Sequence, residues 1–182
     1  MKKIKKILWR IWAILKQPSK TYQKVYSEGL GESMLYFLTI LAILAVVMLA
    51  LGTVFLSLFI SRYFEDFPLI KWVSLPSLAI FIPVSGFVLL TISGLTLHLF
   101  VRLLGGKQGL RQTFKACAYA STPLVLSFWF PPFFVVTVVW SLILTWIGIR
   151  ELQKMTTAKA IISVLLPNIL IITAAYIIRI LL

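Results

Sequence analysis

The chain is short of the residues from which most catalytic and metal sites are built. Its 182 residues include one cysteine, one histidine and five acidic residues. Cys117 alone cannot form an intrachain disulfide, and a metal site needs roughly three or four converging ligands. A hydrolase acting inside a membrane would need a nucleophile and a base within reach of each other. We therefore expect no catalytic residue, no cofactor and no bound metal.

Apolar residues, in contrast, are abundant. Hydrophobic residues make up 60% of the chain and its mean hydropathy is +1.01, whereas globular proteins contain roughly 45 to 50% apolar residues. A helix needs about 20 consecutive apolar residues to cross a bilayer, and residues 34–60 form an uncharged run of 27. The sequence therefore predicts an all-α integral membrane protein.

We expect five transmembrane helices. They lie at residues 34–60 and 73–101, on the two sides of Pro131-Pro132 within 116–149, and at 160–178. The stretch 116–149 is too long for one span, and proline both lacks a backbone donor and clashes with the preceding helical turn. The paired prolines therefore predict a turn between the third and fourth spans.

The basic residues flank these spans unevenly. Eight of the eighteen precede residue 34, and the positive-inside rule places such a flank in the cytoplasm. With five crossings, the C-terminus would then lie outside. We predict a protein of the cytoplasmic membrane with a cytoplasmic segment at 1–33 and a transmembrane domain at 34–182.

The first residues predict an amphipathic helix lying flat on the membrane. Apolar residues recur at helical spacing, namely Ile4, Ile7, Leu8, Ile11 and Leu15. Basic residues beside a membrane are attracted to anionic lipid by about 1 kcal/mol each, so the expected headgroup contacts are Lys2, Lys3, Lys5, Lys6, Arg10 and Trp12. A partner-binding helix fits the same pattern. Pro18 should end the helix, and 19–33 should form a connector.

The net charge of +13 does not indicate a nucleic-acid-binding protein, because stacking aromatics on a soluble basic surface are absent. The segment Gly105-Gly106-Lys107-Gln108-Gly109 is not a nucleotide loop either, since a P-loop would need a glycine where Val101 stands. We expect a tight cytoplasmic turn there. Its backbone N–H groups, with Lys107 and Arg111, are further candidates for contacts to lipid phosphate.

His98 is an ionisable residue inside a predicted span, and such residues are functional candidates by default. It precedes Arg102 by four residues, so both lie on one helical face near the cytoplasmic end. We favour an interfacial role for His98 and Arg102. Proton coupling through His98 remains the alternative.

Two prolines interrupt predicted spans at similar depth, and polar side chains cluster around that level. The cluster comprises Tyr119, Ser121, Thr122, Pro123, Thr137, Trp140, Ser141, Pro167 and Asn168. Interrupted spans at matching depth are typical of a transport site, whereas small and hydroxylated residues also serve helix packing. We favour packing and keep a midplane cavity as the alternative.

Several segments together resemble the prokaryotic branch of the Yip1 family. They are HLFVRLLGGK (98–107), TFKACAYASTP (113–123), Trp140 with WIGIREL (146–152), Lys159-Ala160 leading to Pro167, and the lead-in LKQPSKTY (15–22). The resemblance implies five spans and a cytoplasmic N-terminus. Eukaryotic members assist vesicle trafficking and bind Rab-type GTPases and one another. The sequence lacks their long N-terminal region and their Asp-Leu-Tyr-Gly-Pro type motif, which weighs against a GTPase partner.

The functional prediction is a non-enzymatic membrane organiser or adaptor. It would engage anionic lipid headgroups through its basic face, and other membrane proteins or further copies of itself through its helices. The alternative is a small transporter or lipid-translocating protein with a site between the third, fourth and fifth spans.

Overall fold

The computed structural model describes residues 2–55, 68–127 and 133–181, and the regular structure of these residues is helical throughout. The helices are α1 (Lys2–Lys16), α2 (Pro18–Val25), α3 (Leu30–Phe55), α5 (Pro68–Leu103), α6 (Leu110–Ala120), α7 (Leu124–Ser127), α8 (Phe133–Gln153) and α9 (Thr157–Leu181). The predicted all-α class is confirmed.

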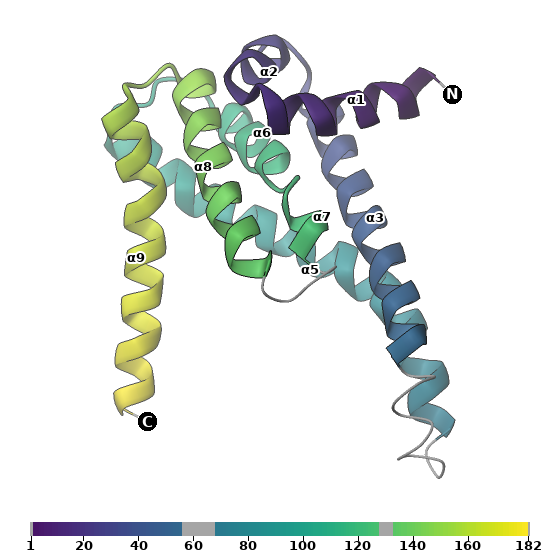
Figure 1. Cartoon of the computed structure of the whole chain (residues 1–182). Coiled ribbons are helices and arrows are strands. Elements are labelled where there is room, and N and C mark those ends of the chain that lie inside the picture. The colour runs from purple at the N-terminus through teal and green to yellow at the C-terminus, as the bar shows by residue number, and fades with distance from the viewer. Residues whose placement is uncertain (1, 56–67, 128–132, 182) are drawn as a thin grey trace.

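The short helices α1 and α2 lie together at one end of the molecule, and the longer helices extend away from them (Figure 1). Helices α3 and α5 pack as a hairpin, and α8 and α9 form a second one. The central helix is α6, which packs against α3, α5 and α8. The C-terminus lies at the end opposite to α1 and α2 (Figure 1).

Four helices among the described residues are long and apolar enough to cross a membrane. The candidate spans are Leu30–Leu51, Ile80–Leu103, Phe133–Gln153 and Thr157–Ile180. At most 28% of each span's most apolar window is buried inside the protein. Most of their surface is therefore available to lipid, which supports a multi-pass membrane protein.

The prediction of five spanning helices is wrong in its third member. The chain that should form it is split into α6 and α7 by a turn at residues 121–123, and neither piece is long enough to span. The break occurs at Pro123, whose ring cannot continue the helical hydrogen bonding. The predicted turn at Pro131-Pro132 lies outside the described residues.

The core lies at the end of the molecule that carries α1 and α2. One buried cluster joins Ile14 of α1 and Tyr22 of α2 to Tyr36, Tyr119 and Ile149 from three further helices. The connector predicted at 19–33 contains most of a helix, because α2 forms within it. The boundary drawn between residues 33 and 34 lies inside α3, and residues on both of its sides share this core.

Candidate functional site

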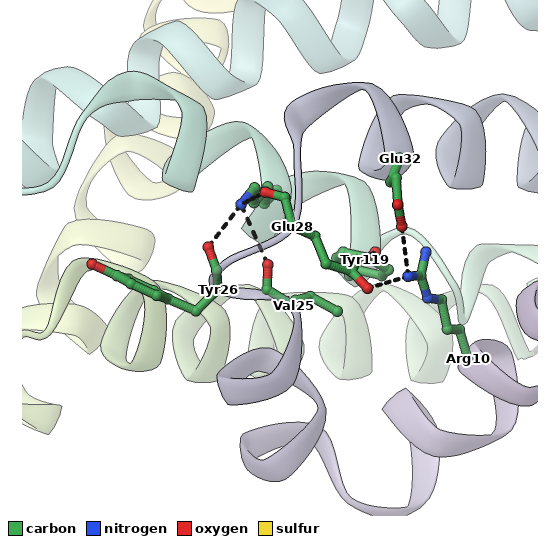
Figure 2. A network of polar contacts seen from close by, with 7 residues as sticks. Arg10, Val25, Tyr26, Glu28, Glu32 and Tyr119 are labelled. Atoms are coloured by element: carbon green, nitrogen blue, oxygen red, sulfur yellow. Dashed lines mark hydrogen bonds and ion pairs between the residues drawn. The ribbon is translucent and has the colours of Figure 1, made fainter.

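An ion-pair network fastens α1 to the rest of the protein. Arg10 is 4% exposed, and its Nη2 bonds Oε1 of Glu28 and, at 2.9 Å, Oε2 of Glu32. The hydroxyl of Tyr119 donates to Oε2 of Glu28 at 3.3 Å, which ties α6 into the same group (Figure 2). Burial alone would lower the pKa of Arg10, but the hydrogen bond to Glu32 leads the effects that raise it. Arg10 is thus a buried cation with two carboxylate partners, so we leave it out of the headgroup-contacting set.

Lys115 fastens the end of α2 in a similar way. Its ammonium donates to the carbonyl oxygens of Val25 at 3.3 Å, of Tyr26 at 3.0 Å and of Glu28. These carbonyls lie at the last residue of α2 and directly after it, where helical acceptors lack intrahelical donors and a cation is favoured. Burial lowers the pKa of Lys115, and the Glu28 carboxylate opposes that shift.

The surface of α1 that remains outside carries both of its tryptophans. Trp9 is 52% and Trp12 is 60% exposed. The ammonium of Lys24 lies 5.4 Å from the Trp9 ring centroid, and that of Lys16 lies 4.5 Å from the Trp12 ring. Cations over exposed indole rings combine charge with an amphipathic aromatic surface. We call Trp9, Trp12, Lys16 and Lys24 the tryptophan face.

Part of the apolar stripe predicted for lipid contact instead packs on protein. Ile7, Ile11 and Leu15 lie partly buried against the core. The helix therefore divides its apolar surface between the bundle and the outside. Lys2, Lys3, Lys5 and Lys6 belong to the first turns of α1, and their headgroup contacts stay a prediction.

His98 and Arg102 lie in the last turns of α5, as predicted. Nδ1 of His98 is 2.8 Å from Oγ1 of Thr113, which also accepts a hydrogen bond from Nε2 of Gln153 at 2.9 Å. Arg102 donates to the carbonyl of Gly106 at 3.4 Å, and Lys107 and Arg111 are exposed. His98 thus joins α5, α6 and α8 through one hydroxyl, an arrangement that is consistent with a structural, interfacial role.

The polar cluster between the predicted third and fourth spans is largely self-satisfied. Thr122 donates to the carbonyl of Tyr119 at 2.6 Å and lies 2.7 Å from the hydroxyl of Tyr36. The carbonyl that Pro123 deprives of its usual donor therefore has another. Three further members are also hydrogen-bonded. The hydroxyl of Ser121 donates to the carbonyl of Ala118, the hydroxyl of Ser141 donates to the carbonyl of Ala120, and the hydroxyls of Thr137 and Ser127 bond each other. Such bonding is typical of helix packing.

Three members of that cluster lie apart from these hydrogen bonds. Trp140 is 44% exposed. Pro167 is buried within α9, and Asn168 is exposed and donates to the carbonyl of Val164 in its own helix at 2.7 Å. The hydrogen bonds of the cluster therefore join α3, α6, α7 and α8, whereas Asn168 bonds only within α9.

Sequence reasoning missed Glu28, Glu32 and Lys115 as partners, because each looked like a solvated charge near a membrane boundary. Tyr22 was also missed. Two signals pointed to α2: Pro18 is suited to the first turn of a helix, and Tyr22 and Val25 are three residues apart. Among the described residues, no group of three or more His, Cys, Asp and Glu side chains is placed to hold a metal ion.

Comparison with known proteins gives the family. No curated protein and no solved structure matches the chain significantly. The family model of the Yip1 domain matches residues 12–178, which is nearly the whole chain and includes α2, the central helix α6 and all four candidate spans except the last residues of α9. The chain therefore belongs to the Yip1 domain family.

Proposed function

We propose that this protein is a non-enzymatic membrane organiser whose α1 and α2 hold a basic, tryptophan-bearing surface against anionic headgroups of the cytoplasmic leaflet. The supporting observation is the division of α1 into two faces. Arg10 is fixed inside by Glu28 and Glu32, while Trp9 and Trp12 remain outside beside lysines. Indole rings favour the headgroup level of a bilayer, and neighbouring lysines favour anionic lipid.

The proposed role as an adaptor, which binds lipid and partner proteins, is based on the fixed orientation of α1. A helix that is anchored by a buried ion pair presents its outer face in one orientation, so less conformational entropy is lost when lipid or a partner binds. The partners we expect are lipids first, and then membrane proteins that reach the same leaflet. Eukaryotic members of the family act in vesicle trafficking. Of that role, this proposal includes only membrane remodelling.

Site-directed spin labelling of the full-length protein tests the proposal. In a Cys117→Ala background, a label at Trp12→Cys should reach headgroup depth in vesicles that contain anionic lipid, and should be shallower in zwitterionic vesicles. A label at Ser27→Cys serves as the control, because Ser27 is exposed beyond α2 and should stay in water. A label at position 12 that remained aqueous in both vesicle types would contradict the proposal.

A further inference from the structure

Two turns of the chain meet, one between α5 and α6 and the other between α8 and α9. A Cβ added to Gly106, in the turn between α5 and α6, would lie 3.2 Å from Sδ of Met155 in the turn between α8 and α9. Nε2 of Gln153 also donates to the carbonyl of Gly109 at 3.3 Å. The two turns are therefore in direct contact.

Two cations from separate helices lie against the Gly105-Gly106 turn. Arg102, at the end of α5, donates to the carbonyl of Gly106 at 3.4 Å. A Cβ added to Gly105 would lie 3.6 Å from Nζ of Lys159, which belongs to the first turn of α9. Both side chains are exposed, as is Lys107, which follows Gly106 in the chain. We call Arg102, Lys107, Lys159 and the Gly105-Gly106 turn the basic turn site.

The described carboxylates do not neutralise this site. Glu28 and Glu32 bind Arg10, and Glu151 binds Arg150 and Gln23. No ion pair joins Arg102, Lys107 or Lys159 to any of these three acids. Like charges held close together repel each other, so an anion supplied from outside the chain would stabilise the site.

The position of the site indicates the kind of anion. Arg102 and Lys159 lie at neighbouring ends of the candidate spans Ile80–Leu103 and Thr157–Ile180. The end of a spanning helix is where lipid phosphates are expected. Apolar side chains one turn further into the two spans are exposed, with Leu99 58% and Ile162 48% exposed. A ligand with phosphate above and acyl chains below matches both surfaces.

We infer that the basic turn site binds an anionic phospholipid whose headgroup carries two negative charges, one facing Arg102 and the other Lys159. Basic pockets between transmembrane helices are suited to such headgroups, and a planar guanidinium recognises phosphate with paired hydrogen bonds. The inference rests on the proposed function in that both engage anionic lipid, but it uses different residues and does not require the tryptophan face.

The test compares lipids at equal total charge. The full-length protein in nanodiscs or mild detergent is titrated with cardiolipin, which carries two phosphates, or with twice as much phosphatidylglycerol, and binding is followed by native mass spectrometry. We expect cardiolipin to bind more tightly. Arg102→Gln with Lys159→Gln should weaken its binding about thirtyfold, on the order of fivefold for each charge.

The matched control is Lys20→Gln with Arg179→Gln, which also removes two exposed charges. An equal loss in this control, or no loss in the site variant, would overturn the inference. Inorganic pyrophosphate that binds as tightly as cardiolipin would also overturn it, because the ligand would then be a free diphosphate and not a lipid.

A second variant separates binding from folding. Lys159→Glu places a carboxylate where the lipid charge would lie, so it should abolish the cardiolipin preference while raising thermal stability in lipid-free detergent. A fall in that stability would contradict the inference. The depth of a spin label at position 12, measured in these variants, distinguishes the two proposals. If cardiolipin binding is lost and the label depth is unchanged, both proposals are supported. If cardiolipin binding is retained and the label is aqueous, only the proposed function is refuted.

Discussion

The ring of Tyr22 occupies the space that a side chain at position 148 would need. A Cβ added to Gly148 would lie 2.8 Å from Cζ of Tyr22 and 2.9 Å from Cβ of Ala116. Tyr22 is fully buried there, and its hydroxyl donates to the carbonyl of Ala116 at 3.3 Å. Helices α2, α6 and α8 therefore pack closely at this point because α8 carries a glycine.

The first prediction concerns this contact. Gly148→Ala should lower the free energy of unfolding by about 1 to 3 kcal/mol, the usual cost of overpacking a well-packed core. Thermal unfolding of the purified protein in detergent measures it. Gly31→Ala is the matched control, because an added Cβ there meets nothing within 4 Å and alanine favours a helix. Equal stability of the two variants would show that α2 is not seated against α8 as described.

Lys115 supplies the second prediction. Lys115→Met keeps an unbranched side chain of nearly the same length but leaves the carbonyls of Val25, Tyr26 and Glu28 without this donor, which should cost about 1 to 3 kcal/mol. Amide hydrogen exchange in α2 should become faster, because α2 loses its attachment to α6. In Lys20→Met, which removes an exposed ammonium from α2 itself, exchange should stay close to that of the wild type. Unchanged exchange in Lys115→Met would sink the prediction.

The contacts of Tyr22 and Lys115 show which parts of the fold hydropathy could not predict. Long uncharged runs predicted the helices that became α3, α5, α8 and α9, because lipid exposure demands such runs. The helix α6 is buried by protein, so small residues such as Ala116 and an inward-pointing Lys115 suit it, and its sequence resembled a loop followed by part of a span.

The same limit explains the ion-pair network. Arg10 lay in a row of lysines with the same charge, and only the fold brings Glu28 and Glu32 to it, 18 and 22 residues later. The end of a helix at Pro18 was predictable because proline restricts its neighbours locally. The partners of Arg10 were not, because long-range pairing leaves no periodic signal in one sequence.

Tyr22 gives the third prediction, on pH dependence. Burial raises the pKa of Tyr22 well above 10.0, so above about pH 10 the unfolded chain loses this proton while the folded protein keeps it. The unfolded state then binds fewer protons, and stability falls as pH rises. The stability that Tyr22 contributes is therefore fully present below pH 10 and is lost above it.

The measurement compares the wild type with Tyr22→Phe between pH 8 and roughly pH 11. The difference isolates Tyr22 from Lys115, whose lowered pKa gives an opposite slope in the same range. The phenylalanine variant should be the less stable one at pH 8, since it lacks the hydrogen bond to Ala116, and should lose less stability on going alkaline. Parallel curves for the two proteins would refute a titration effect of Tyr22.

The last prediction separates packing from transport in the polar cluster. Thr122→Val removes the donor to the carbonyl of Tyr119 and the partner of the Tyr36 hydroxyl, so it should cost about 1 to 3 kcal/mol. Asn168→Leu, on the exposed side of α9, should change stability by less than about 0.5 kcal/mol. Unfolding in mixed detergent micelles measures both.

The packing interpretation requires this ranking because Thr122 joins α3 to the turn after α6, whereas Asn168 bonds only the preceding turn of its own helix. The reverse ranking, or a solute or lipid flux in proteoliposomes that Asn168→Leu abolishes without unfolding the protein, would instead favour a pathway along α9.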